Sequence, residues 1–280
     1  MTTATAIQTT LASSLQRRGW AVVTGASAGL GVEFARQLAK KGYDVVLVAR
    51  RRDRMQKLAH ELESSFGVKT LILEVDLSVP GASTGLLRAL GDHGVNPDVL
   101  VNNAGVGLHG LALEQSVERT IQMVQLNVVA LTELTLGVAS MMVARGSGKI
   151  LNVSSTASFQ PNPYVAAYGA TKAFVTSFSV ALAHELAPRG VRVLAHCPGP
   201  TRTEFNDVAD LRVGAGDWAY MSAERCVAIG LRALDAGRWV IVTGLINFLV
   251  VYFSRRSPLW LVTRVTGWLL RPTRPASLRS

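Results

Sequence analysis

Residues 21–31 read Ala-Val-Val-Thr-Gly-Ala-Ser-Ala-Gly-Leu-Gly, an apolar run followed by a glycine-rich turn. The apolar run predicts a short buried strand, and the apolar positions after it recur at helical spacing as far as Leu38. Glycine permits the tight turn and a close backbone approach to a ligand, while the free N–H groups of a helix start favour phosphate. A plain strand-to-helix turn is the alternative. The stretch therefore predicts a pyrophosphate-binding turn with five candidate residues: Gly25, Ser27, Gly29, Leu30 and Gly31.

Strands and helices alternate along the rest of the chain. The helical patterns cover 54–66, 82–90, 117–144, 168–186 and 223–235. This alternation predicts right-handed βαβ crossovers and a parallel sheet covered on both faces. We therefore expect an α/β fold with a doubly wound, mainly parallel Rossmann sheet. Its strands are predicted at 21–24, 43–49, 70–75, 98–101, 149–153, 191–196 and 239–243.

One domain accounts for nearly the whole sequence, because the strands run along it without a linker or an internal repeat. We expect an N-terminal extension at 1–17 and the Rossmann domain at 18–257. A substrate lid is expected at about 204–221. Residues 258–280 are expected to form an amphipathic, basic C-terminal segment, which makes a helical appendage.

The net charge of +10 is concentrated near the C-terminus. From Trp239 to Ser280 there are six arginines and no acidic residue, and Trp260 and Trp268 lie within apolar runs. This mixture favours a lipid surface over a nucleic acid groove. Packing on its own domain and a dimer contact are the alternatives for the helix predicted beyond Pro258. Trp239–Phe253 is too short to span a bilayer, which takes about 20 apolar residues.

The cysteines and histidines suggest neither a disulfide framework nor a metal site. Cys197 and Cys226 are the only cysteines, and the five histidines show no metal-binding spacing. We therefore expect no metal and a reducing compartment, with the protein cytoplasmic or peripheral to a membrane. No secretory signal pattern is evident, although the Thr/Ala/Ser-rich start weakly resembles a transit peptide.

The end of the second predicted strand discriminates between the nicotinamide cofactors. An acidic residue there would bind the ribose 2′-OH of NAD, but the strand ends Val-Ala-Arg-Arg-Arg at 48–52. Arg50 is placed to pair with a 2′-phosphate. A solvated charge run is the alternative. We expect NADP(H) to be preferred, with NAD(H) as the second choice.

Tyr168-Gly-Ala-Thr-Lys172 places a phenol and an ammonium one helical turn apart on the same face. An adjacent ammonium favours phenolate, which would lower the tyrosine pKa toward the working range. Such a tyrosine is a usable acid or base for alcohol and carbonyl chemistry. The pair is also frequent by chance, so its weight comes from the other motifs.

Those motifs occur in one order along the chain. Asp76-Leu77 follows the third strand, and Asn102-Asn-Ala-Gly105 follows the fourth. Asn127 lies in the long helix, Ser155 after the fifth strand, and Pro198-Gly199 after the sixth. With the glycine-rich turn and Tyr-xxx-Lys, residues 18–240 resemble the short-chain dehydrogenase/reductase family.

The resemblance implies roles for individual residues. Tyr168 would be the general acid or base, and Lys172 would bind the nicotinamide ribose and lower the pKa of Tyr168. Ser155, rather than Ser154, would hold the substrate oxygen, and Asn127 would support a proton-relaying water. The other implied cofactor contacts are Asp76, Leu77, Asn103, Ala104, Gly105, Pro198, Gly199, Thr201 and Thr203.

The substrate is expected to be a hydrophobic ketone or aldehyde, or the corresponding alcohol. The lid carries Phe205, Leu211 and Trp218 with few charges, and Phe159, Pro161 and Tyr164 are expected on the other approach. We expect a homo-oligomer, a dimer or a tetramer, and no nucleic acid partner. A catalytically silent Rossmann-fold binding protein and a membrane-associated scaffold are the alternatives.

Overall fold

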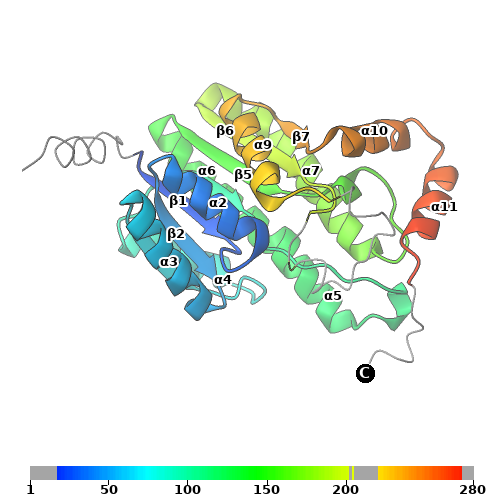
Figure 1. Ribbon diagram of the computed structural model, residues 1–280, viewed down its shortest axis with the longest axis horizontal. Helices are drawn as coiled ribbons and strands as arrows, with labels where there is room; N and C mark the ends of the chain where they lie inside the picture. Colours follow the sequence, from blue (N-terminus) through cyan, green and yellow to red (C-terminus); the bar gives the residue numbers. More distant parts are fainter. Residues whose placement is uncertain (1–17, 202–203, 205–219, 273–280) are drawn as a thin grey trace, which may run out of the picture.

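Seven parallel strands form one sheet in the part of the chain that the computed structural model describes, residues 18–201, 204 and 220–272 (Figure 1). The order across the sheet is β3-β2-β1-β4-β5-β6-β7. The crossover from β3 to β4 makes β1 and β4 neighbours, and ligands bind at such a switch point in doubly wound folds. The strands are β1 (Trp20–Thr24), β2 (Asp44–Ala49), β3 (Thr70–Glu74), β4 (Pro97–Asn102), β5 (Gly148–Val153), β6 (Val191–Cys197) and β7 (Val240–Val242).

Helices connect the strands and cover both faces of the sheet. The α-helices are α2 (Gly29–Lys40), α3 (Arg52–Phe66), α4 (Ala82–Asp92), α5 (Val117–Val124), α6 (Leu131–Arg145), α7 (Ala166–Leu186), α9 (Ala223–Asp235), α10 (Leu245–Ser254) and α11 (Leu259–Leu269). Shorter helical turns are η1 (Ala112–Glu114), the π-helical η2 (Gln125–Ala130), η3 (Thr156–Phe159) and η4 (Ala187–Arg189).

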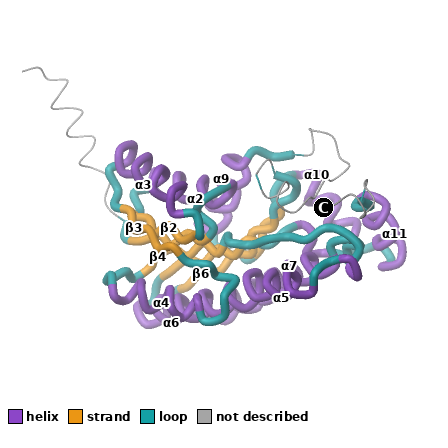
Figure 2. Tube along the Cα trace, turned by 90° about the horizontal axis from the view of Figure 1, so that it is seen from below, coloured by secondary structure: helices purple, strands orange, loops and turns teal. Residues whose placement is uncertain are grey.

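Two hydrophobic clusters hold the three layers together. On one face α2, α3 and α9 bury residues such as Phe34, Leu62 and Leu231 against the sheet. On the other face α4, α6 and α7 bury residues such as Leu86 and Met142. Figure 2 shows the strands edge-on between these two helical layers. The strands read as nearly continuous apolar runs because both of their faces are covered.

The structure confirms the predicted fold class, with local differences. The long predicted helix is interrupted by η2, a single π turn around Asn127. The helix predicted from Tyr168 begins two residues earlier, at Ala166. The seventh strand is shorter than predicted, and α10 was not predicted, because its uniformly apolar sequence has no helical periodicity. The division at residue 257 stays a prediction; it falls between α10 and α11.

The helical stretch Val117–Arg145 is the one described segment long and apolar enough to cross a membrane. Its Leu134, Val138 and Met142 are nevertheless buried in the cluster beneath the sheet. Extracting this stretch would dismantle that layer of the domain. The stretch is therefore a core element of the fold.

Helices α10 and α11 lie beyond the carboxyl ends of the strands (Figure 1). The Ser254 hydroxyl donates to Gln160 Oε1 at 3.4 Å, and the Thr266 hydroxyl donates to the Pro161 carbonyl at 3.0 Å. His109 Nε2 lies 2.7 Å from the carbonyl oxygen of Leu270. These contacts attach the helical appendage to the loops that follow β4 and β5.

Candidate active site

A cavity of about 1320 Å³ opens at the carboxyl ends of the strands. It runs from the glycine-rich turn, past the ends of β4 and β5, to α10 and α11. The cavity brings together every candidate site residue that lies within the described part of the chain except Gly31 and Asn127. Thr203 and most of the expected lid lie outside the described residues.

The backbone of the glycine-rich turn makes contacts that are too close for a residue with a side chain. Gly25 has φ +68°, the left-handed region that favours glycine. A Cβ on Gly31 would lie 2.1 Å from the carbonyl oxygen of Gly25, so α2 packs directly against the turn. The preceding residue, Ala28, provides no side-chain cap to α2. The N–H of Gly31 donates to the Ala28 carbonyl at 3.2 Å. The start of α2 at Gly29 and Leu30 lines the cavity, and a helix N-terminus favours an anion there.

Asn103 holds this turn in place from the neighbouring strand. Its side-chain amide donates to the carbonyl oxygens of Thr24 and Gly25, at 3.0 and 3.4 Å. The buried Thr24 hydroxyl in turn accepts from the backbone N–H groups of Asn103 and Ala104, both at 3.0 Å. The side chain of Asn103 is therefore a support for the turn, and its backbone is part of the cavity wall.

Arg50, which is predicted to pair with the 2′-phosphate of NADP(H), is two-thirds exposed. It lies 3.7 Å from Asp76. Burial raises the pKa of Asp76, but hydrogen bonds from Ser78 and the charge of Arg50 outweigh it, so the pKa is lowered. Asp76 Oδ1 accepts from the Ser78 N–H at 2.9 Å and from its hydroxyl at 2.6 Å. Asp76 is thus ionised and fixed at the cavity rim.

A second arginine, Arg51, reaches the same rim and was not singled out from the sequence. Its Nε donates to the Ser27 hydroxyl at 3.2 Å, beside the glycine-rich turn. Its Nη1 lies 3.4 Å from a carboxylate oxygen of Glu204, and Arg54 Nη1 donates to both oxygens of Glu204 at 2.9 Å. The arginine run at 50–54 was the available signal, but nothing in it indicated Glu204 as the partner.

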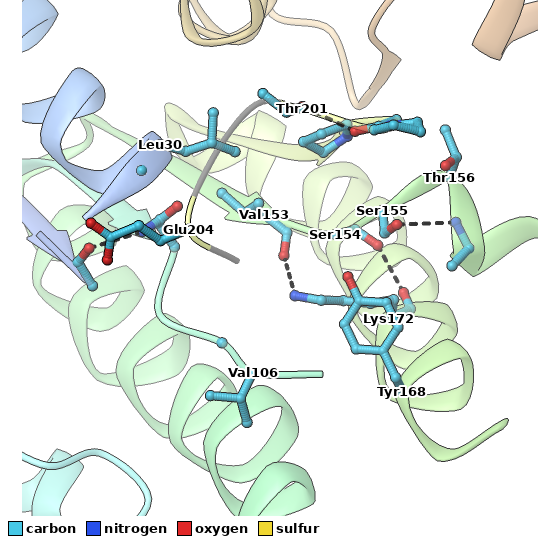
Figure 3. A pocket seen from close by; sticks show the side chains of 18 of the residues that line it. Leu30, Val106, Val153, Ser154, Ser155, Thr156, Tyr168, Lys172, Thr201 and Glu204 are labelled. Atoms are coloured by element: carbon cyan, nitrogen blue, oxygen red, sulfur yellow. Dashed lines mark hydrogen bonds between the residues drawn. The ribbon is translucent and has the colours of Figure 1, made fainter. Parts of the chain in front are cut away.

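Ser155, Tyr168 and Lys172 lie together on the opposite wall of the cavity (Figure 3). The spacing within α7 places Tyr168 and Lys172 one turn apart, and Lys172 Nζ is 5.8 Å from the centroid of the Tyr168 ring. Ser155 is positioned at the start of η3, where its hydroxyl accepts from the Ala157 N–H at 3.1 Å. The Ser154 hydroxyl donates to the Lys172 carbonyl at 2.9 Å, and Ser154 also lines the cavity.

Burial controls the ionisation of Tyr168 and Lys172. It raises the pKa of Tyr168 to about 12, although a hydrogen bond with Ser155 acts in the opposite direction. It lowers the pKa of Lys172 to about 8, and Nζ donates to the Val153 carbonyl at 2.9 Å. The expectation that Lys172 lowers the tyrosine pKa is therefore not met in this structure, because desolvation of the phenolate dominates.

Asn127 is fully buried in the π turn η2. Its Oδ1 accepts from the Val106 N–H at 3.0 Å, and its Nδ2 donates to the Val106 carbonyl at 2.9 Å and to Thr171 at 3.1 Å. A Cβ on Gly105 would lie 3.1 Å from Asn127 Oδ1 and 3.4 Å from Lys172 Nζ. Gly105 thus lets Asn127 and Lys172 approach the same point, in a helical irregularity of the kind often found at functional sites.

The segment after β6 forms the third side of the cavity. The Pro198 carbonyl accepts from the Thr156 N–H at 2.9 Å, and the Thr201 hydroxyl donates to the Gly199 carbonyl at 3.0 Å. A Cβ on Gly199 would lie 2.2 Å from the side chain of Asn247, so this segment packs closely against α10. These contacts connect the candidate nicotinamide-binding segment to the helical appendage.

Helices α10 and α11 form the apolar end of the cavity, which the sequence analysis missed. They contribute Leu245, Ile246, Asn247, Val250, Thr266, Trp268, Leu269 and Leu270. On the opposite approach the structure places Gln160, Asn162 and Val165 at the wall, in place of the expected Phe159, Pro161 and Tyr164. None of the three expected residues belongs to the cavity wall, and the Phe159 ring instead lies 6.0 Å from the guanidinium of Arg255.

Comparisons with known proteins agree with this geometry. The family model described as short chain dehydrogenase matches residues 19–212. A very-long-chain 3-oxoacyl-CoA reductase of Podospora anserina is 40% identical over 179 residues, which are 62% of this chain and 52% of that protein. A reductase of the same name from Bos taurus is 32% identical over 254 residues, 88% of this chain and 78% of that protein. The chain thus spans about half the length of the Podospora relative.

A solved structure of a short-chain dehydrogenase from Sphingobium yanoikuyae in complex with NADPH superposes with a TM-score of 0.77. It is 32% identical, and the match covers 92% of this chain and 98% of that one. A bulky-bulky ketone specific alcohol dehydrogenase from Comamonas testosteroni has a TM-score of 0.74 at 28% identity, covering 94% and 98% of the two chains. By its sequence motifs, sheet topology and family match, this chain belongs to the short-chain dehydrogenase family.

Proposed function

We propose that the protein is an NADP(H)-dependent oxidoreductase that interconverts a hydrophobic ketone or aldehyde and the corresponding alcohol. The observation that carries the proposal is the position of Ser155, Tyr168 and Lys172. They lie between the phosphate-binding turn at one end of the cavity and the apolar walls of α10 and α11 at the other. A carbonyl held at this junction lies within reach of both a bound cofactor and a proton donor.

Bound nicotinamide would supply or accept the hydride. The Tyr168 hydroxyl donates the proton to the carbonyl oxygen in reduction, and the Tyr168 phenolate accepts the alcohol proton in oxidation. The Ser155 hydroxyl holds the same oxygen by a hydrogen bond. A pKa of about 12 keeps Tyr168 protonated at neutral pH, which suits a general acid. Lys172 would bind the nicotinamide ribose, and Asn127 would support a water that relays protons to Lys172.

Replacement of Tyr168 by phenylalanine tests this assignment, because it keeps the ring and removes the proton. With a panel of hydrophobic ketones that includes 3-oxoacyl thioesters, Tyr168→Phe is expected to lose at least about a hundredfold in turnover. Its dissociation constant for NADPH should stay close to that of the wild type. Tyr43→Phe, at a buried tyrosine in the cluster formed by α2, α3 and α9, is the matched control and should keep its turnover.

Two results would contradict the assignment. Near-normal turnover by Tyr168→Phe would remove this residue from the reaction. Cofactor binding by the wild type with no turnover on any member of the panel would favour a catalytically silent binding protein.

The NADP(H) preference is supported by the charges at the rim. No carboxylate ends β2, and Arg50 and Arg51 line the cavity next to Ser27. We expect an NADPH preference of about ten- to a hundredfold, typical of charge-assisted contacts. Arg50→Asp should reverse or erase it, and Arg51→Ala should weaken it. Equal efficiencies with NADH and NADPH in the wild type would refute this reading of the two arginines.

We retain the expectation of a homo-oligomer in a reducing compartment such as the cytoplasm. Helices α5, α6 and α7 expose Val117, Ile121, Leu136 and Phe174, apolar side chains that a second copy could cover. Both cysteines are free and buried, in agreement with reducing conditions. Light scattering of the purified protein gives the oligomeric state, and a monomer would contradict the expectation.

A further inference from the structure

Helices α10 and α11 expose an apolar surface that the reaction does not use. Among the residues of these two helices only Val251 and Val262 are buried. Several exposed side chains line the cavity, but eight do not. We call these eight the outer face: Phe248, Leu249, Tyr252, Phe253, Leu259, Trp260, Leu261 and Val265.

The outer face is organised as a stripe with aromatic side chains. Phe248, Leu249, Tyr252 and Phe253 recur at the spacing of one helix side. The Tyr252 ring contacts Phe253 with centroids 5.5 Å apart, and contacts Phe248 at 6.4 Å. Leu259 and Trp260, on the next helix, are each more than 65% exposed. Such a group of exposed apolar side chains is more than the single exposed residues of an ordinary protein surface.

Positive charge lies on and next to α10 and α11, and neither helix carries an acidic residue. Arg255 and Arg256 lie between the two helices, Arg264 lies on α11, and Arg271 follows it. None of the four forms an ion pair with a described residue. The guanidinium of Arg256 lies 3.7 Å from the centroid of the Tyr252 ring, so one cation is held directly against the apolar stripe.

We propose that the outer face of α10 and α11 docks on the surface of an anionic lipid bilayer. Apolar and tryptophan side chains would enter the boundary between headgroups and acyl chains, while the arginines bind anionic headgroups. With 10 residues, α10 is about 15 Å long, half of the roughly 30 Å hydrocarbon core, so it lies on the bilayer rather than across it.

The charge pattern favours a bilayer over a second copy of the chain. A twofold contact through this face would bring the arginines of both copies into one interface, and neither α10 nor α11 carries an acidic residue to pair with them. That arrangement is repulsive, whereas an anionic surface is complementary to it.

Docking through α10 and α11 would also place the apolar end of the cavity next to the lipid. Leu245, Val250 and Trp268 line the cavity from the same two helices, so docking brings its apolar end to the lipid boundary. Entry of a membrane-dissolved substrate by this route rests on the proposed function, but the docking itself does not.

Vesicle sedimentation of the full chain tests the proposal independently of catalysis. Phosphatidylcholine vesicles with and without phosphatidylglycerol are the probes, at low and high salt. The wild type should sediment with the anionic vesicles, and added salt should weaken the binding.

Two double variants separate the contributions of the arginines and of the apolar side chains to vesicle binding. Arg256→Gln with Arg264→Gln should bind at least about tenfold more weakly, since each arginine near an anionic surface contributes about fivefold. Phe253→Ser with Trp260→Ser should lose at least about tenfold, because two large side chains no longer enter the lipid. The matched control, Val79→Ser with Arg88→Gln, removes an exposed apolar and an exposed basic residue at or near α4 and should bind like the wild type.

A second measurement uses a variant that keeps the outer face apolar. Brominated phosphatidylglycerol should quench the fluorescence of the wild type, and Trp260→Phe should show less quenching with unchanged vesicle binding. All variants should keep the thermal stability and NADPH affinity of the wild type, because the altered side chains are exposed and outside the cavity.

Three outcomes would overturn the proposal. The first is a wild type that stays in the supernatant with anionic vesicles at low salt. The second is equal binding by the wild type and both double variants. The third is a lower oligomeric state of the apolar variant in light scattering without vesicle binding by the wild type, which would make the outer face a subunit contact.

Discussion

The buried ammonium of Lys172 should make the stability of the protein depend on pH in a way that one substitution removes. Its pKa is lowered from 10.5 to about 8, with desolvation as the main cause. Each pKa unit corresponds to about 1.4 kcal/mol. Keeping this group protonated in the folded protein at neutral pH therefore costs about 3 kcal/mol of folding free energy.

The direction of the effect follows from the lowered pKa. Between about pH 8 and 10.5 the unfolded chain binds more protons at this position than the folded protein, so stability rises with pH. From about pH 7.5 to 9.5 the unfavourable contribution of Lys172 to the free energy of folding should decrease by about 2 kcal/mol. Below about pH 7 the full cost is present, and above about pH 11 it disappears.

Lys172→Met removes the titrating group and keeps an unbranched chain of similar length. The Val153 carbonyl loses its partner at 2.9 Å, which costs about 1–3 kcal/mol, so the variant should be close to the wild type in stability at neutral pH. The free energy of unfolding of the wild type, relative to Lys172→Met, should then rise by about 2 kcal/mol between about pH 7.5 and 9.5.

Urea denaturation of both proteins across this pH range, without cofactor, measures the difference. Comparison of the two proteins cancels the titration of shared groups that do not interact with Lys172, such as Cys226. Lys57→Met, at an exposed position of α3, is the matched control and should run parallel to the wild type. A constant difference between the wild type and Lys172→Met at all pH values would refute the reasoning.

Three other substitutions test the supports of the cofactor end. Gly31→Ala should weaken NADPH binding at least about tenfold in a fluorescence titration, because its Cβ would lie 2.1 Å from a backbone oxygen of the turn. Gly85→Ala is the control, since its Cβ meets nothing within 4 Å. That variant should raise the free energy of unfolding by about 0.5–1 kcal/mol. Thr24→Val should cost about 1–3 kcal/mol in urea denaturation, because the partly buried N–H of Ala104 loses its acceptor, and an unchanged midpoint would contradict that role. Glu204→Gln should tighten NADPH binding by about threefold, a small effect because the ion pairs with Arg51 and Arg54 are exposed; equal tightening for NADH would show that the 2′-phosphate is not involved.

The fold could be predicted because its determinants are local. Each buried strand reads as an apolar run of several residues, and the glycine-rich turn follows the first of them directly. Tyr168 and Lys172 are one helical turn apart in any α-helix, so their proximity needed no tertiary information. The motif order then placed Ser155 and Asn127 near them.

Other parts of the site depended on contacts between distant segments. Glu204 pairs with Arg54 across 150 positions of sequence, and no local pattern connects the two. Helix α10 was missed because an apolar run of 10 residues suits a strand, a buried helix or an exposed one equally well. Its place beside the cavity follows from its contacts with the segment after β6.

By itself, the sequence determined the doubly wound α/β fold, the glycine-rich turn and the spacing of the residues that carry the proposed proton transfer, because periodicity and short spacings dictate these features. Only the tertiary structure decided which arginines meet Ser27 and Glu204, which helices close the apolar end of the cavity, and that the pKa of Tyr168 is raised instead of lowered. Those properties depend on desolvation and on the approach of segments far apart in the chain. Both arise only when the sheet and its two helical layers have packed.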